Sequence, residues 1–215
     1  MSFVGIAHHY FVYIAEGAGI TAEITLGAAV IAIVIGLVAA ACRLSRFRWL
    51  RAPVTVYIEV IRNTPALLQL FLVYFGLAEI GLVLPALLSA ILTLGILGGA
   101  FLTEIFRAGI VSVERGQTEA ALSMGMNYFQ VMRRVVLPQA LRLVIPPSTN
   151  FLIGLIKDTS LVLTIAVPEI MYRAYTVSSL TYQAIYVFAI AGAIYFAICF
   201  PLSRLALRLE TRFAY

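Results

Sequence analysis

Long apolar runs, separated by short charged stretches, make up most of this chain. Five of these runs contain no charged residue, and they cover positions 24–42, 63–78, 80–103, 143–156 and 174–203. The runs are continuous and do not alternate apolar with polar positions, so they favour membrane-spanning helices over the strands of a barrel. The pattern predicts an all-α membrane protein with about five transmembrane helices.

The lengths of the runs predict where the helices are irregular. The run at 63–78 has 16 residues, which is short for a span. The run at 143–156 has 14 residues and ends at Lys157 and Asp158, so we expect an irregular fourth helix. The run at 174–203 has 30 residues, more than one span requires, so we expect part of it to form a loop or an interfacial segment.

The N-terminal segment 1–19 has a different character from the later runs. Positions 3–14 are apolar and aromatic, with His8 and His9 among them, which predicts an interfacial helix on the outer face of the membrane. The histidine pair lacks an evident third ligand, so we assign no metal site to it.

Composition and charge placement support a membrane protein and a definite orientation. The chain is 62% hydrophobic and 12% charged, with a net charge of +5. Its arginines gather after the first, third and fifth runs, a distribution that sets topology and gives no support to nucleic-acid binding. The positive-inside rule then places the N-terminus outside and the C-terminus inside. We treat residues 1–215 as a single transmembrane domain.

The polar segment between the third and fourth runs carries an ordered pattern. Glu119, Ala120 and Ala121 are followed by Gly125 in a Glu-Ala-Ala-x-x-x-Gly spacing. The sequence predicts that Thr118 caps a helix with Glu119 in its first turn. It also predicts that Gly125 ends this helix in the left-handed conformation.

The continuation of this polar segment predicts a second short helix. Asn127 is expected to cap it, and positions 128–136 continue it as an amphipathic stretch. Leu137 and Pro138 follow, and we expect Pro138 to stop or redirect the chain.

The spacing from Glu119 to Gly125, followed by Val135-x-Leu137-Pro138, resembles the EAA loop of ABC importer permeases. Two further segments narrow the resemblance to the polar amino-acid branch of that family: Tyr57-Ile-Glu-Val-Ile-Arg-Asn-Thr-Pro65-Ala-Leu-Leu-Gln69 and Glu104-Ile-Phe-Arg107-Ala-Gly-Ile-Val-Ser-Val-Glu-Arg-Gly-Gln117. The similarity runs from about Thr21 to the C-terminus.

The resemblance implies a type I ABC importer transmembrane fold in the bacterial cytoplasmic (inner) membrane. It implies a multi-pass permease for polar amino acids that pairs with a second permease subunit, identical or homologous. It also implies separate ATPase subunits, which bind ATP and Mg, and an extracytoplasmic amino-acid-binding protein. The cytoplasmic coupling loop 108–142 would contact the ATPase through these residues: Glu119, Ala120, Ala121, Gly125, Leu137 and Pro138.

This chain by itself contains no ATP-hydrolysing motif. Its only lysine is Lys157, and the surrounding sequence lacks the Gly-x-x-x-x-Gly-Lys-Ser/Thr pattern that holds phosphates. We therefore expect a transporter subunit with no cofactor of its own and not an enzyme. Cys42 and Cys199 are too few and too widely separated for a disulfide framework.

Charged residues at membrane depth are the candidates for a solute path. Lys157 and Asp158 interrupt an apolar stretch, and they either line a path or form a buried ion pair that fixes a bend. Glu104 is a further candidate, but it lies one helical turn from Arg107 and can simply pair with it.

Two other positions carry structural expectations. Pro65 is expected to open the second helix, with Asn63 or Thr64 as its cap. Glu169 is expected near the outer surface, together with Glu79 and Arg173, either solvated or in contact with a binding protein.

Two rival functions fit the same chain. An ion-driven carrier or channel would use Glu104, Lys157 and Asp158 as ion sites, and its uptake would not depend on an ATPase. A membrane scaffold without transport activity would copurify with an ATPase but show no substrate-stimulated hydrolysis.

Overall fold

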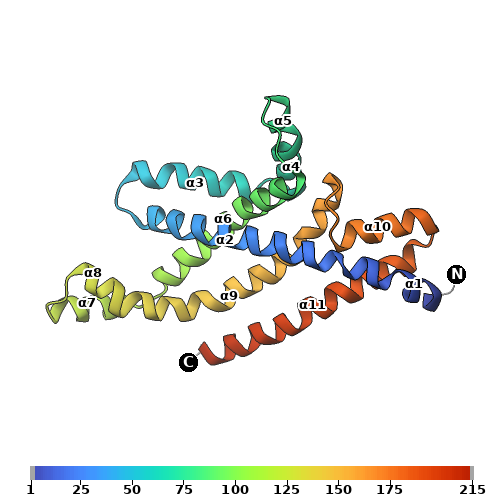
Figure 1. Ribbon diagram of the computed structural model, residues 1–215. Coiled ribbons are helices and arrows are strands. Elements are labelled where there is room, and N and C mark those ends of the chain that lie inside the picture. The colour runs from blue at the N-terminus through green and yellow to red at the C-terminus, as the bar shows by residue number, and fades with distance from the viewer. Residues whose placement is uncertain (1–2, 214–215) are drawn as a thin grey trace.

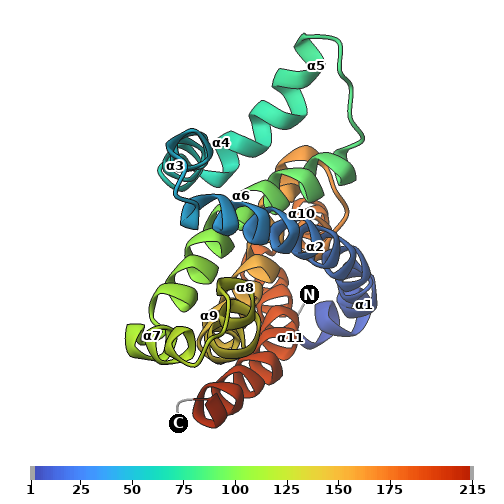
Figure 2. The same ribbon diagram turned by 90° about the vertical axis from the view of Figure 1, so that its left-hand side faces the viewer.

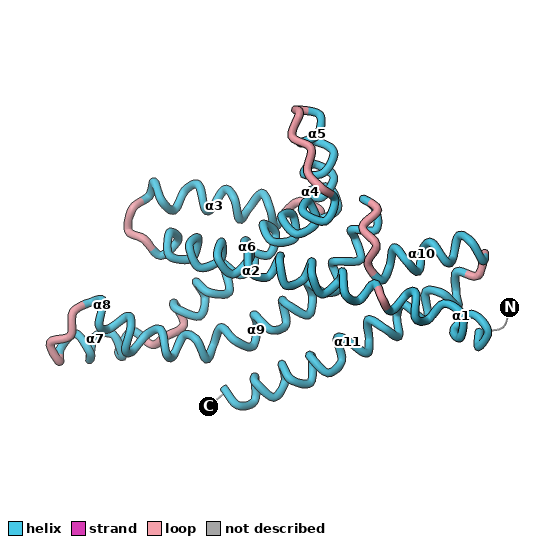
Figure 3. Tube along the Cα trace, in the orientation of Figure 1, coloured by secondary structure: helices cyan, strands magenta, loops and turns pink. Residues whose placement is uncertain are grey.

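The computed structural model describes residues 3–213, and its secondary structure in this part of the chain is helical throughout. Short loops join the helical elements (Figure 3). In chain order the helical elements are α1 (Phe3–Ala15), α2 (Gly17–Leu44), α3 (Arg48–Arg62), α4 (Ala66–Phe71), the π-turn η1 (Leu72–Gly76), α5 (Leu77–Glu79), α6 (Ala86–Val111), α7 (Arg115–Ser123), α8 (Tyr128–Val131), the π-turn η2 (Met132–Val136), α9 (Leu137–Asp158), the 3₁₀ turn η3 (Thr159–Ile165), α10 (Ile170–Thr181) and α11 (Ala184–Phe213).

The centre of the molecule is the close packing of α6 against α2 and α9. This approach depends on glycines in α6. A Cβ atom on Gly95 would lie 2.7 Å from the side chain of Ile31, and one on Gly98 would lie 2.8 Å from both Ala32 and Phe151. Small residues at these positions let apolar helices approach closely, as is common between helices in membranes.

A second cluster closes one end of the molecule, where α1 and α10 lie (Figure 1). Buried side chains of α1, α10 and α11 pack there, and Ile6, Ile170 and Val187 are fully buried among them. A Cβ atom on Gly17 would lie 2.5 Å from the backbone nitrogen of Ile170, so the start of α2 touches the start of α10. Helices α7 and α8 lie at the opposite end.

An arm made of α4, η1 and α5 projects from the bundle in both views (Figures 1 and 2). It makes an angle of 106° with α3. Pro65 precedes its first helix, as the sequence predicts, but neither Asn63 nor Thr64 caps it. Their side chains donate back to carbonyl oxygens of α3, and the amide of Gln69 instead donates to the carbonyl of Thr64 across the bend.

The five predicted spans correspond to three long helices and two bent pairs. Helices long and apolar enough to cross a membrane cover His9–Leu44, Ala86–Val111 and Ala184–Thr211. The other two candidates are the pair that bends at Pro65 and the pair that bends between η3 and α10, so the described part of the chain has three to five candidate spans.

The predicted irregularity of the fourth and fifth spans agrees with the structure. Helix α9 passes into the 3₁₀ turn η3 directly after Asp158. The long fifth run is divided, because α10 ends at Thr181 and Tyr182 takes a left-handed conformation with φ 57° before α11 begins. The N-terminal segment is helical from Phe3, and residues 1–2 lie outside the described part.

Candidate functional site

Helix α7 ends in the way that the Glu-Ala-Ala-x-x-x-Gly spacing predicts. Gly125 has a φ of 83°. The N–H of Met126 donates to the carbonyl of Ala121 at 3.2 Å, and the N–H of Gly125 donates to Leu122 at 2.9 Å. This pair of bonds satisfies carbonyl groups that would otherwise have no partner at the helix end, and it requires a left-handed residue where Gly125 stands.

The next turn is capped by Asn127, as predicted. Its side chain accepts from the N–H of Gln130, and the side chain of Gln130 accepts from the N–H of Asn127, each at 2.9 Å. Together with Gly125, this reciprocal cap fixes the geometry of the connection between α7 and α8.

The prediction that Thr118 caps α7 is wrong. The helix begins three residues earlier, at Arg115, with Glu114 preceding it. Thr118 is therefore inside the helix, and Glu119 lies in its second turn. The N–H of Gln117 donates to the carbonyl of Glu114, so the helical ladder is already established before Thr118.

The three predicted coupling residues at the start of the motif do not share one face. Glu119 and Ala120 are exposed, whereas Ala121 is only 5% exposed. Ala121 packs against Val131 and Val136 in a small core of its own. Its small size therefore serves the packing of α7 against the following turns, and Glu119 with Ala120 forms the outward face.

Pro138 does not stop the helix. The chain remains helical from Tyr128 to Asp158 because the π-turn η2 comes directly before Leu137, whose N–H donates to the carbonyl of Met132. A proline lacks the N–H that a regular turn would use, and the wider turn moves the hydrogen bonding by one residue at this point. Leu137 and Pro138 are thus the first two residues of α9, and η2 joins α8 to them.

A groove of about 400 Å³ lies beside this segment and is lined by residues of α6, α7, α8 and η2. Glu119 and Thr118 contribute to its polar side, and Met132 and Val136 to its apolar side. Within residues 3–213, nothing pairs with the carboxylate of Glu119. The groove thus presents Glu119, together with Arg115, beside an apolar surface.

Glu104 is held by two arginines. One carboxylate oxygen accepts from Arg107 at 2.7 Å and 3.0 Å, and the other lies 3.5 Å from Arg43 of α2. Arg43 also donates to the hydroxyl of Thr55 in α3 at 2.6 Å. The predicted pairing of Glu104 with Arg107 is confirmed, and both carboxylate oxygens are engaged in joining α2, α3 and α6.

Lys157 and Asp158 do not form a buried ion pair, which was one of the two alternatives that the sequence left open. Lys157 is exposed and Asp158 is half-buried, and no ion pair joins them in the described part of the chain. Lys157 lines a cavity of about 320 Å³ between η3, α10 and α11, with Ser160 and Tyr195 among the other lining residues. Glu104 lines a different cavity, so the structure does not bring the three candidate path residues together.

Glu169 is not solvated at the surface, contrary to expectation, because it is fully buried. Its carboxylate accepts from the N–H groups of Met171 and Tyr172 at the start of α10, and from the hydroxyl of Tyr195 at 2.7 Å. An acidic residue directly before an apolar helix is a cap signal that the sequence contained. Burial of Glu169 depends on α11, which is distant in sequence.

Arg173 pairs with an element at the far end of the chain. Its guanidinium donates to Glu16 at 2.8 Å and to the carbonyl of Tyr13, and it stacks over the Tyr13 ring. Glu16 itself is exposed at the junction of α1 and α2. The contact joins α10 to the N-terminal helices.

Arg62 and two phenylalanines form a stack that sequence reasoning missed. The guanidinium of Arg62 lies 5.2 Å from the centre of the Phe101 ring, which stacks on Phe151 at 6.0 Å. The stack connects the end of α3 to α6 and α9.

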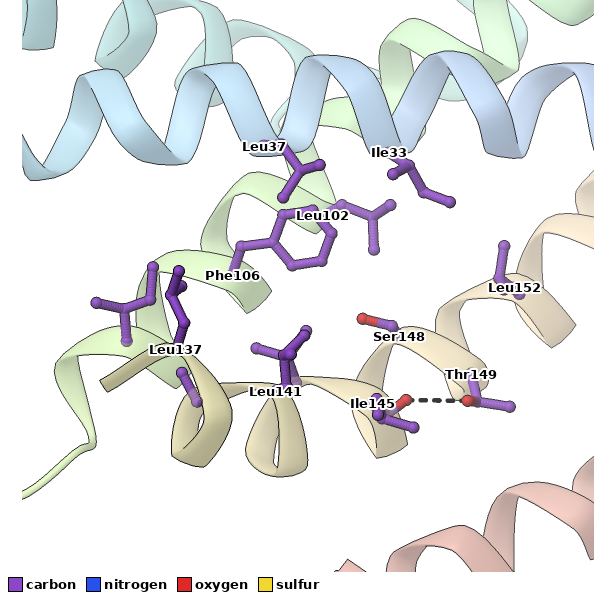
Figure 4. Close-up of a pocket in the computed structure, with 13 residues that line it drawn as sticks. Ile33, Leu37, Leu102, Phe106, Leu137, Leu141, Ile145, Ser148, Thr149 and Leu152 are labelled. Carbon is purple, nitrogen blue, oxygen red and sulfur yellow. Dashed lines mark hydrogen bonds between the residues drawn. The ribbon is translucent and has the colours of Figure 1, made fainter. Parts of the chain in front are cut away.

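Between α2, α6 and α9 lies a further cavity of about 380 Å³, lined almost entirely by apolar side chains (Figure 4). The hydroxyl of Thr149 is satisfied by the carbonyl of Ile145, whereas the Ser148 hydroxyl has no partner in the described residues. No charged side chain lines this cavity, so it is unsuited to hold a zwitterion.

Long apolar helices with an ordered helical loop, α7 and α8, at one end of the molecule (Figure 1) are the architecture expected of the membrane subunit of a transporter. The model of the family described as "Binding-protein-dependent transport system inner membrane component" matches residues 32–215. The chain therefore belongs to this family of ABC transporter components, and it is a multi-pass protein of the bacterial inner membrane. It is a transport component and not an enzyme.

Relatives cover nearly the whole chain. It is 36% identical to the probable glutamine ABC transporter permease protein GlnP of Bacillus subtilis (strain 168), over 99% of each chain. It is 35% identical to the arginine transport system permease protein ArtQ of the same organism, over 93% of this chain and 92% of that protein.

A solved structure described as "Crystal structure of an amino acid ABC transporter with histidines" has a similar fold. It superposes with a TM-score of 0.93 at 34% identity, and 99% of each chain is covered. The predicted all-α fold of a type I ABC importer permease is confirmed.

Proposed function

We propose that this chain is the transmembrane permease subunit of an ATP-driven importer of polar amino acids, and that it works as a dimer with separate ATPase subunits. Family membership supports the permease role. The names of the relatives and of the solved neighbour support an amino acid as the solute. The observation that most supports the proposal is helix α7, which ends in a defined turn at Gly125 and exposes Glu119 and Ala120.

In this proposal the ATPase docks on α7 and α8. Large apolar side chains are exposed here: Met124 is 84% exposed and Phe129 is 70% exposed. Apolar groups on a segment outside the membrane favour a protein partner. Because Ala121 packs against Val131 and Val136, a displacement of α7 moves η2, and η2 is continuous with α9. Docking is thereby coupled to a helix that spans the membrane.

The second permease subunit packs on the arm formed by α4, η1 and α5. No residue of η1 or α5 is buried within this chain. Leu72 is 60% exposed and Phe75 is 51% exposed. An apolar cavity of about 320 Å³ lies at the base of the arm and includes Leu72 in its lining. The arm projects away from the bundle and is available to a second copy or a homologue (Figure 2).

The solute path in this proposal passes the cavity beside Lys157. A zwitterionic amino acid presents a carboxylate and an ammonium group, and each requires a partner at membrane depth. Lys157 supplies the cation at the cavity, and Asp158 adjoins it at the end of α9. Glu104 is a weaker candidate because both of its oxygens are engaged with arginines.

In the proposed orientation, the end of the molecule with α1 and α10 lies outside and the end with α7 and α8 lies inside. The clustering of arginines toward the α7 end supports this assignment. The external binding protein then meets the outer end, where α10 lies, and delivers the amino acid there.

Co-reconstitution with the ATPase in liposomes tests the proposal. Uptake of labelled glutamine or arginine is expected only with ATP and the matching binding protein. The Glu119→Ala variant should lower uptake, whereas Glu210→Ala, which changes an exposed carboxylate of α11, should not. Uptake driven by an ion gradient without the ATPase would show that the chain is instead a secondary carrier.

A further inference from the structure

The turn between α2 and α3, together with the first residues of α3, presents two aromatic rings outward. Trp49 is 71% exposed and Phe47 is 45% exposed, and their ring centres lie 6.1 Å apart. The turn is ordered, because the N–H of Phe47 donates to the Ser45 hydroxyl and the carbonyl of Phe47 accepts from Leu50. These rings are therefore held on the surface by the backbone.

Three exposed arginines are close to these rings in the sequence. Arg46 places its guanidinium 4.8 Å from the centre of the Phe47 ring, and Arg48 and Arg51 are also exposed. Arg43, which lies a few residues earlier, by contrast forms an ion pair with Glu104 and a hydrogen bond with Thr55. Across residues 3–213 no ion pair involves Arg46, Arg48 or Arg51. Positions 46–51 thus carry three exposed guanidinium groups without an ion pair and two exposed aromatic rings.

The position of the turn indicates which part of the membrane it contacts. Helix α2 is an apolar span, and its uncharged run ends at Cys42, a few residues before the turn. The turn lies at the same end of the molecule as α7 and α8 (Figure 1). Aromatic rings at the end of a span lie at the headgroup level of a bilayer, and arginines there attract anionic lipids.

We propose that Arg46, Phe47, Arg48, Trp49 and Arg51 form a binding site for the headgroup of an anionic phospholipid. The guanidinium groups donate to the phosphate, and the two rings lie between the headgroups and the acyl chains. The charge is complementary to an anionic lipid, and a zwitterionic lipid offers no net charge to match. The site depends on membrane location and not on the proposed import function.

Trp49 reports on this site directly because it is the only tryptophan of the chain. The full chain is placed in lipid nanodiscs that contain a small fraction of either brominated phosphatidylglycerol or brominated phosphatidylcholine, with identical acyl chains. Bromine quenches tryptophan fluorescence on contact. We expect stronger quenching by phosphatidylglycerol at equal fraction, and loss of the difference at high salt.

Variants separate the site from general charge attraction. Removing one arginine is expected to lower the preference for phosphatidylglycerol by roughly fivefold at most, and the triple Arg46→Gln, Arg48→Gln, Arg51→Gln variant should abolish it. Arg204→Gln is the matched control, because Arg204 also stacks on a phenylalanine, Phe200, at 5.1 Å, but lies on α11. The control should keep the wild-type preference.

Three outcomes would overturn the proposal. Equal quenching by the two lipids in the wild-type chain would show that no anionic headgroup is selected. Absence of quenching by either lipid would show that a protein surface covers Trp49. Competition by soluble inorganic phosphate at millimolar concentration would assign the arginines to a free anion and not to a lipid.

Discussion

The hydroxyl of Tyr195 in α11 donates a 2.7 Å hydrogen bond to the fully buried carboxylate of Glu169 ahead of α10. This hydrogen bond joins two segments that the break at Tyr182 separates, in addition to the apolar packing of α10 on α11. It lies beside the cavity that Lys157 lines, because Tyr195 lines the same cavity.

Replacing Tyr195 by Phe should destabilise the chain. The substitution leaves Glu169 with its two backbone donors only, and the loss of a hydrogen bond to a buried charged group costs about 1–3 kcal/mol of unfolding free energy. Thermal unfolding of the purified chain in detergent measures this. Tyr182→Phe is the control because Tyr182 is 92% exposed. Equal unfolding temperatures for both variants would contradict the importance of the Tyr195–Glu169 contact.

The orientation can be tested by labelling. In a background without Cys42 and Cys199, Asn127→Cys and Tyr182→Cys place single thiols on exposed residues at opposite ends of the molecule. A reagent that does not cross membranes should label position 182 from outside the cell and position 127 only in inverted vesicles. Labelling of position 127 from outside would reverse the proposed topology.

Gly125→Val should uncouple the permease from its ATPase. An added Cβ meets no atom within 4 Å, so the φ of 83°, and not a steric clash with neighbours, is what a larger residue violates. The strain is about 1 kcal/mol or more for a residue forced into the left-handed region. We expect normal membrane insertion with reduced ATP-driven uptake.

The control for this change is Gly19→Ala in α2. It also has open space around its Cβ position, but it has no left-handed conformation. Uptake and ATPase association at wild-type levels in Gly125→Val would remove the coupling role from this glycine.

Glu104→Gln should lower the stability of the chain and not its selection of solute. A glutamine cannot keep both Arg43 and Arg107 compensated, and we expect a loss of about 1–3 kcal/mol because charge-assisted hydrogen bonds are replaced by neutral ones. Unfolding in detergent and uptake kinetics are measured side by side. Wild-type stability with a raised KM would instead place Glu104 on the solute path.

The sequence was most informative where a local rule determines the geometry. The left-handed Gly125 at the end of α7 and the cap by Asn127 depend on residues a few positions apart, and both were predicted. The reciprocal bond from Gln130 was not part of the prediction. The start of α7 was misplaced because Thr118 is a good cap in principle, but the helix had already begun at Arg115. A strong cap residue does not exclude an earlier start.

Contacts between distant segments could not be predicted from the sequence. Hydropathy does not distinguish a buried Glu169 from a solvated one, because its burial depends on Tyr195 of another helix. The same limit applies to Arg173, whose partner Glu16 lies near the other end of the chain. The helix start at Pro65 was predicted from the sequence, but the bend of 106° that precedes it was not, because the angle depends on how α3 and α4 each pack on α6.

The last prediction concerns Lys157 and Asp158, which are adjacent in sequence but not joined by an ion pair. If they were a buried pair, removing both charges would restore stability better than removing one, because no unpaired charge would remain. This argument does not apply to the structure, because Lys157 is exposed and lines a cavity. The double variant Lys157→Gln with Asp158→Asn should therefore be no more stable than either single variant.

Transport should respond differently from stability. Lys157→Gln takes the cation away from the cavity, so the carboxylate of an amino acid loses its partner and KM should rise at least tenfold, on the order of 1.4 kcal/mol. Asp158→Asn is expected to lower uptake as well, through the ammonium group. Lys157→Arg, which keeps the charge, should retain more activity than Lys157→Gln. Wild-type kinetics in both single variants would exclude these residues from the solute path, and recovery of stability only in the double variant would show that the charges are paired after all.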